Sequence, residues 1–402
     1  MSGASGQRPD TVTKELTMQI SRRGQIDPFL VMEVMRAADA RAATGADVLH
    51  LEVGQPSTQA PASVLRAAHA ALDADKLGYT DAFGLPELRE KLAGHYKATY
   101  GVTVDPARIC LTVGSSGGFL LAFLAAFDAG ARVALASPGY PAYRNILSAL
   151  GIEVVEILTG PESGFHPTVE QLSAVQPLDG VIVASPANPT GTVLSREALA
   201  ALLSWCRNHG VRLVSDEIYH GLTYTGNATC ALELPESGGE RAIIVNSFSK
   251  YFSMTGWRLG WLILPEDLVR SVECLAQNFF ISAPTLAQRA ALGAFEATEE
   301  LEANRQRYAR NRAILLEELP KAGFSQFAPA DGAFYLYADV GHLTNDSVAF
   351  CQKILMETGV AITPGVDFDP QRGSRTVRFS FAGSEEAMRE SARRLIEWSH
   401  RS

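Results

Sequence analysis

Residues 181–219 decide the fold, and they read VIVASPANPTGTVLSREALAALLSWCRNHGVRLVSDEIY. Two short runs rich in β-branched residues, Val181 to Ala184 and Arg212 to Ser215, flank a longer segment with helical periodicity. Ser195 can cap that helix, in which apolar residues recur three and four positions apart until Gly210 ends it. A strand, a helix and a second strand in this order predict one crossover unit of a parallel sheet.

The same alternation extends from about residue 60 to residue 290, with further strands expected at Ile109 to Val113, Arg132 to Ala136 and Ile243 to Asn246. It predicts an α/β fold with a mostly parallel central sheet and helices on both faces. After residue 290 we expect a long charged helix (about Glu296 to Leu319), then strands around Ala333 to Val340, Val360 to Thr363 and Thr376 to Phe381, and a last helix from Ser384. That pattern is typical of a smaller α+β domain.

The expected domain organisation has four parts. A polar tail covers 1–17, an N-terminal segment that joins the small domain covers 18–59, the large domain covers 60–291, and the small C-terminal domain covers 292–402.

Composition excludes several classes of protein. The 402 residues are 47% hydrophobic, and 35 Lys and Arg against 44 Asp and Glu give a net charge of -9, so nucleic acid is not an expected partner. The first seventeen residues lack the apolar core of a secretory signal, and no apolar run reaches the ~20 residues that span a bilayer. The five cysteines, Cys110, Cys206, Cys230, Cys274 and Cys351, form no metal-binding or disulfide pattern. We therefore expect a cytoplasmic protein with reduced thiols, no metal and no membrane.

Three short motifs each suggest a different kind of chemistry. Gly114 to Gly118 matches G-x-S-x-G between a strand and a helix expected near Phe119, which would make Ser116 the nucleophile of a hydrolase. The same Gly-rich turn would also bind an anion, because free amides and the positive end of a helix dipole meet there. The spacing fits both interpretations.

The second motif, Ser-Phe-Ser-Lys at 247–250, matches the S-x-x-K of serine β-lactamases, but the S-D-N and K-T-G elements that those enzymes also need are missing from the sequence. The third, Ser-Asp-Glu-Ile-Tyr at 215–219, places an acid at the carboxyl end of a strand, where open α/β sheets bind ligands.

The motifs at 215–219 and 247–250 belong to an ordered series of nine, in which the Gly-rich turn is part of 112–116. The others are Leu-Glu-Val-Gly-Gln-Pro (51–56), Tyr-Thr-x-x-x-Gly-x-x-Glu-Leu-Arg (79–89), Thr-Val-Gly-Ser-Ser (112–116), Ser-Pro-Gly-Tyr-Pro-x-Tyr (137–143), Ser-Pro-Ala-Asn-Pro-Thr-Gly (185–191), Met-Thr-Gly-Trp-Arg-Leu-Gly (254–260) and Val-Arg-Phe-Ser (377–380). With them the chain resembles the class I/II aminotransferases of fold type I, in the bacterial aspartate and aromatic aminotransferase group, which depend on pyridoxal phosphate (PLP). The resemblance extends from about Ser21 to the last helix.

The chemistry of PLP assigns several residues. Its phosphate needs helix amides, hydroxyls and a cation, which Ser115, Ser116, Ser247, Ser249 and Arg258 could supply. Its ring nitrogen needs a buried carboxylate to stay protonated, for which Asp216 is the candidate. Its aldehyde needs an amine that desolvation can keep neutral, and Lys250 follows a strand.

The resemblance implies further roles. Lys250 would form the internal aldimine, Tyr219 and Asn188 would bind the phenolic oxygen, and Tyr140 would stack on the ring. Arg378 and the amide of Gly54 would hold the substrate α-carboxylate, with Asn188 beside them, while Tyr79 would reach the phosphate of a neighbouring subunit in a homodimer. The implied reaction moves an amino group between an L-amino acid and a 2-oxo acid by a ping-pong mechanism.

Two rivals stay open, a PLP-dependent carbon–sulfur β-lyase on the same fold and the Ser116 hydrolase. A PLP-binding regulator is disfavoured, because only about twenty residues precede the matched region, too few for a DNA-binding module. The substrate pair is open too. A dicarboxylic substrate needs a second cation, for which Arg22 and Arg23 are candidates.

Overall fold

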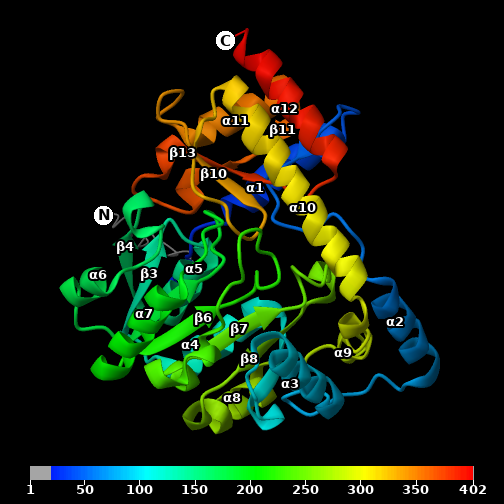
Figure 1. Ribbon diagram of the computed structural model, residues 1–402, viewed down its shortest axis with the longest axis vertical. Helices are drawn as coiled ribbons and strands as arrows, with labels where there is room; N and C mark the ends of the chain where they lie inside the picture. The colour runs from blue at the N-terminus through cyan, green and yellow to red at the C-terminus, as the bar shows by residue number, and fades with distance from the viewer. Residues whose placement is uncertain (1–19, 402) are drawn as a thin grey trace, which may run out of the picture.

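A seven-stranded sheet forms the centre of the larger part of the molecule (Figure 1). The computed structural model describes residues 20–401, so the expected tail at 1–17 lies outside the described residues. The strands are β2 (Ile109–Val113), β3 (Arg132–Ser137), β4 (Glu153–Leu158), β5 (Gly180–Ala184), β6 (Arg212–Asp216), β7 (Ile243–Ser247) and β8 (Leu259–Ile263), in the order β2-β8-β7-β6-β5-β3-β4. The neighbours from β4 to β7 pair in parallel, whereas β8 runs antiparallel to β2 and β7. The predicted mostly parallel sheet is confirmed.

Helices cover both faces of this sheet, as predicted. They are α2 (Ala62–Ala74), α3 (Pro86–Tyr100), α4 (Gly114–Ala126), α5 (Pro141–Leu150), α6 (Val169–Ala174), α7 (Arg196–His209), α8 (Glu266–Phe279) and α9 (Thr285–Ala291). In β5, Val181 and Val183 belong to one apolar cluster and Ile182 to another, because successive side chains of a strand point to opposite faces. The clusters contain α7 on one face and α4 on the other.

The capping signals predicted for α7 are also confirmed. The Ser195 hydroxyl accepts a hydrogen bond from the amide of Ala198 at 3.1 Å, and Gly210 ends the helix with φ of 68°.

A second, smaller sheet stands at the other end of the molecule with α10, α11 and α12 (Figure 1). It contains β12 (Thr363–Pro364), β13 (Thr376–Ser380), β10 (Tyr335–Asp339) and β9 (Gln326–Phe327), and it is antiparallel. The helices around it are α1 (Leu30–Ala42), α10 (Thr298–Glu318), α11 (Ser347–Thr358) and α12 (Glu385–Ser399). This confirms the smaller α+β unit. The boundaries at 59/60 and 291/292 stay a prediction, although most of the small sheet's own apolar cluster comes from residues after 292.

The strand expected from Val360 to Thr363 is wrong as a single element. Val360 and Ala361 form β11, which pairs with β1 (Leu49–His50), whereas Thr363 and Pro364 form β12 and pair with β13. The chain passes from one sheet to another at the buried Ile362, a change that an unbroken apolar run does not reveal.

The expected start of a helix near Phe119 is also wrong, because α4 begins at Gly114. Gly114 adopts φ of +65°, which glycine tolerates, so the chain turns from β2 into α4 within one residue. The Gly-rich motif is therefore the first turn of the helix, and it contains the amides of Ser115 and Ser116.

None of the helices within residues 20–401 is long and apolar enough to cross a membrane. All five cysteines are free, and four of them are buried.

Candidate active site

A cavity of about 470 Å³ lies where the carboxyl ends of β5, β6 and β7 face the small sheet. Open α/β sheets bind ligands at this edge. Most of the predicted site residues line it: Gly54, Ser115, Ser116, Tyr140, Asn188, Asp216, Tyr219, Ser249, Lys250, Arg258 and Arg378. Segments from residue 54 to residue 378 thus supply one site.

Lys250 lies in the turn that follows β7, and its Nζ donates a hydrogen bond to the carbonyl of Gly54 at 2.7 Å. Burial, followed by the nearby charges of Arg378 and Arg258, lowers the pKa of Lys250 to about 8, against the opposing effect of Asp216. An amine with this pKa is available as a nucleophile near neutral pH.

Asp216 ends β6 and is almost fully buried. The hydroxyl of Tyr143 donates to Oδ2, and the amide of Ile218 donates to Oδ1 at 3.0 Å. Burial raises the pKa of Asp216 to about 6, although both hydrogen bonds and Lys250 act against that rise. A cationic partner such as a protonated pyridine nitrogen would offset the cost of burying this carboxylate.

The part of the cavity lined by the start of α4 and by Arg258 suits a phosphate. The amides of the first turn of α4 lie there with Arg258, and a Cβ added to Gly114 would come within 2.5 Å of the Arg258 guanidinium. Gly260 allows β8 to pack closely against the start of α4, because a Cβ at Gly260 would lie 2.9 Å from the amide nitrogen of Ser115. Backbone amides and a guanidinium are the groups that bind phosphates in proteins.

Ser247 does not line the cavity. Its buried hydroxyl accepts from the amide of Ser249 at 3.0 Å and can donate to either the Ser249 hydroxyl at 2.8 Å or the carbonyl of Leu259 at 3.0 Å, so it orients Ser249 from behind. The expected direct contact of Ser247 with a phosphate stays a prediction.

Arg378, in β13, is held in a fixed position in the cavity lining. Its guanidinium stacks over the rings of Tyr335 and Phe368, 4.3 and 4.7 Å from their centroids, and Nη1 donates to Oδ1 of Asn188 at 2.9 Å. Nε is buried with no hydrogen-bond partner within residues 20–401. A fixed guanidinium with an unused donor matches the planar geometry of a carboxylate.

Tyr335 is a site residue that the sequence analysis missed. It lines the cavity from β10, and its hydroxyl bonds to that of Tyr219 at 2.7 Å. A Cβ on Gly54 would lie 1.8 Å from this hydroxyl, which explains the glycine. Tyr143 was also missed, although it stands in a quoted motif whose P-x-Tyr spacing could have indicated it.

Three further predicted residues, besides Ser247, lie outside this cavity. Tyr79 is 83% exposed, as expected for a side chain that reaches a neighbouring subunit. Arg22 and Arg23 lie in an exposed turn and do not line the cavity, so nothing in the structure supports them as the second cation.

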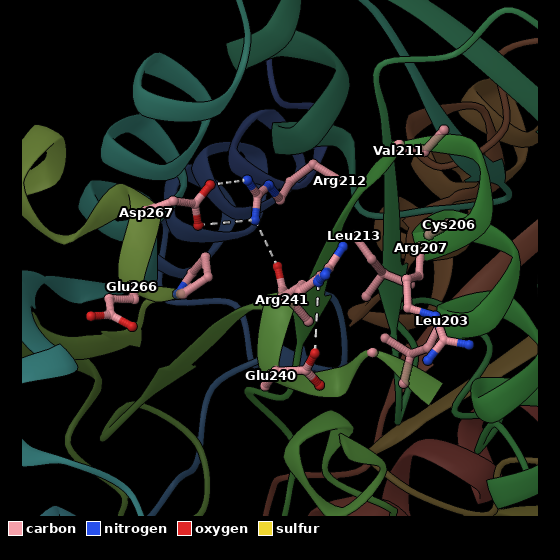
Figure 2. A pocket seen from close by; sticks show the side chains of 14 residues that line it. Leu203, Cys206, Arg207, Val211, Arg212, Leu213, Glu240, Arg241, Glu266 and Asp267 are labelled. Carbon is pink, nitrogen blue, oxygen red and sulfur yellow. Dashed lines mark hydrogen bonds and ion pairs between the residues drawn. The ribbon is translucent and has the colours of Figure 1, made fainter. Parts of the chain in front are cut away.

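A second cavity, of about 760 Å³, opens at the opposite edge of the sheet, near the start of β6 and β7 (Figure 2). Its three arginines already have partners: Arg207 donates to the carbonyl of Glu236, Arg212 pairs with Asp267, and Arg241 pairs with Glu240. We assign it no function.

The first cavity combines the Lys250 amine, the Asp216 carboxylate, the first-turn amides of α4 with Arg258, and the Arg378 guanidinium. Together with the fold, these groups define a PLP-dependent enzyme of fold type I. Among known proteins, the family model described as "Aminotransferase class I and II" matches residues 46–395, and the chain belongs to this family. It is 54% identical over 388 residues to the valine–pyruvate aminotransferase of Mycobacterium tuberculosis, covering 95% of this chain and 99% of the relative. It is 35% identical over 383 residues to the aspartate/prephenate aminotransferase of Thermus thermophilus, covering 94% and 97%.

Solved structures agree with this assignment. An aminotransferase from Mycobacterium tuberculosis superposes with a TM-score of 0.93 at 53% identity, covering 96% of this chain and all of that one. The aspartate aminotransferase of Thermus thermophilus with maleate superposes with a TM-score of 0.88 at 34% identity, covering 95% and 100%. The protein is therefore an aminotransferase that uses PLP and moves an amino group between an amino acid and a 2-oxo acid, with the ping-pong mechanism general to the family.

Proposed function

We propose that this enzyme takes the amino group from an uncharged L-amino acid such as valine and passes it to pyruvate. The observation that carries the proposal is the set of charged side chains that line the cavity: Asp216, Lys250, Arg258 and Arg378. Each has a proposed role toward the cofactor or the α-carboxylate. Among the described residues, therefore, no charged side chain in the cavity lining is left to bind a second carboxylate. The valine–pyruvate relative, at 54% identity, supports the same choice of substrates.

The proposed roles follow from the contacts of each residue. PLP, when bound, supplies an electron sink for the electrons of the Cα–H bond. Arg378 binds the α-carboxylate and fixes Cα, and Asp216 keeps the ring nitrogen protonated. The Lys250 amine would accept the proton that leaves Cα and return it during the reaction. Tyr219 and Asn188 would bind the phenolic oxygen, and Tyr140 would stack on the ring.

We also propose a cytoplasmic homodimer in which Tyr79 completes the site of the neighbouring copy. The exposure of Tyr79 supports the homodimer. The free cysteines support the cytoplasmic location.

The two alternatives have less support. The described residues that line the cavity include no histidine to act as a base for Ser116, which disfavours the hydrolase. A β-lyase would use the same cofactor and the same lysine, so only an assay separates it. Release of pyruvate and ammonia from cystathionine without a 2-oxo acid acceptor would favour the lyase.

The decisive experiment measures alanine formed from L-valine and pyruvate by the PLP-loaded enzyme. Lys250→Ala should lower the rate by about 10⁴-fold, because the residue that moves the proton is lost. The exposed Lys91→Ala serves as the control and should retain full activity. Residual activity of Lys250→Ala near that of the control would refute the proposed role of Lys250, and a faster reaction with aspartate than with valine would refute the proposed substrate.

A further inference from the structure

The first turn of α1 is capped by a residue from the far end of the chain. Phe29, the residue before the helix, provides no side-chain cap. Instead, Oδ1 of Asp367 accepts from the amide of Leu30, and Oδ2 accepts from the amide of Val31, both at 3.1 Å. A carboxylate at this position satisfies two free amides and also interacts favourably with the helix dipole.

Asp367 is itself fixed by the large part of the molecule. It is 4% exposed, and its backbone carbonyl accepts from Nη2 of Arg144 at 3.2 Å. Arg144, in α5, also pairs with Glu156 of β4 at 3.3 Å. The start of α1 is thus positioned by a buried acid that is tied to the large sheet.

The capped segment forms one wall of the active-site cavity. Phe29, Val31 and Met32 line it, and the ring of Phe29 meets the ring of Tyr140 edge to face at 5.8 Å between centroids. All three side chains are apolar, and Tyr140 is the residue assigned to the ring face of the cofactor. A substrate side chain that leaves Cα on this side would therefore contact an apolar surface.

We propose that Asp367 is a positioning residue for substrate selectivity: by capping α1 it holds Phe29, Val31 and Met32 as an apolar wall against the side chain of an aliphatic amino acid. This inference rests on the proposed function. Each methylene that such a wall recognises is worth roughly tenfold or more in relative kcat/KM. Valine should therefore depend on the wall, whereas alanine, with one methyl group, should depend on it little.

The test compares kcat/KM for L-valine and L-alanine in single-turnover reactions of the PLP-loaded enzyme. Asp367→Ala should lower the ratio of valine to alanine by about tenfold, with the rate for alanine changed by less than about threefold. Asp367→Asn keeps one oxygen acceptor and should recover part of the ratio. Met32→Ala, which leaves the cap intact, should also lower the ratio.

Asp346→Ala is the control, because Asp346 also caps a helix, with its Oδ1 accepting from the amides of Val348 and Ala349 of α11 at 3.1 Å, and does not line the cavity. It should lower thermal stability and leave the ratio unchanged. Equal losses of kcat/KM for valine and alanine in Asp367→Ala would overturn the inference while leaving the proposed function intact. Wild-type ratios of valine to alanine in both Asp367→Asn and Met32→Ala would do the same. A wild-type enzyme that accepts neither amino acid would overturn both.

Discussion

Lys250 shows at the residue scale how burial prepares a group for chemistry. The Lys250 amine is buried near the charges of Arg378 and Arg258, which disfavour its protonated form, and the pKa falls to about 8. Because a lowered pKa leaves the amine neutral above about pH 8 and protonated below it, capture of PLP by the apoenzyme should speed up as the pH rises through about 8. An ordinary lysine would need a pH of about 10.4.

Stopped-flow absorbance over the range from about pH 6 to pH 10 would measure this profile. Arg378→Gln should move its midpoint upward, since one of the two charges that oppose protonation is lost. The exposed Arg389→Gln, on α12, should leave the midpoint in place. A wild-type midpoint near that of free lysine, or no shift in Arg378→Gln, would contradict this electrostatic account.

Several predicted site residues follow a strand or begin a helix, so their neighbours in sequence revealed their positions, whereas Arg378, inside β13, was predicted from the resemblance. Asp216 ends β6, and Ser115 and Ser116 begin α4. Tyr335 could not be found in this way. It is the first residue of the buried strand β10, and the hydroxyl it contacts belongs to Tyr219, 116 residues earlier. A tyrosine inside an apolar run looks like part of the core until the fold brings its partner close.

At the scale of elements, the phosphate end depends on how closely β8 approaches the start of α4. A Cβ at Gly260 would lie 2.8 Å from the carbonyl oxygen of Asn246 and 2.9 Å from the amide nitrogen of Ser115, and both are backbone atoms that cannot rotate away. Gly260→Ala should therefore displace the first turn of α4 and weaken PLP binding by about tenfold or more, an effect of roughly 1.4 kcal/mol. Equilibrium titration of the apoenzyme with PLP would measure it.

Gly94→Ala is the matched control for Gly260→Ala. A Cβ at Gly94, in α3, would meet nothing within 4 Å. Alanine at this exposed position should stabilise the helix by about 1 kcal/mol and leave PLP affinity unchanged. Equal PLP affinity of Gly260→Ala and the wild type would show that the close packing of β8 on α4 is not needed for the cofactor.

Elements with strong local signals were predicted well, and those set by distant contacts were not. The caps of α7 and the parallel strands agree with their sequence patterns. The antiparallel direction of β8 follows from its pairing with both β2 and β7, and the division of residues 360–364 follows from two different partner strands. No periodicity within a strand records which neighbour it will have.

At the scale of the whole molecule, the exposed side chains around Tyr79 bear on the proposed homodimer. Tyr79 is 83% exposed, and Phe279 and Ile281 are 56% and 50% exposed. The two segments are adjacent, because the hydroxyl of Thr285 donates to the carbonyl of Gly78 at 2.6 Å. Exposed aromatic and aliphatic side chains in one region are typical of protein interfaces.

If Tyr79 serves the neighbouring copy, two inactive variants should restore each other. In a mixed dimer of Lys250→Ala and Tyr79→Ala, one site carries both defects, whereas the other combines Lys250 of one chain with Tyr79 of its partner and is intact. Unfolding and refolding an equal mixture should therefore yield about one quarter intact sites, since half of randomly paired dimers are mixed and each has one such site. Activity of the mixture well above the average of the two variants would establish the shared site. If Tyr79 instead acted within its own chain, each site of a mixed dimer would keep one defect, and mixing would restore nothing.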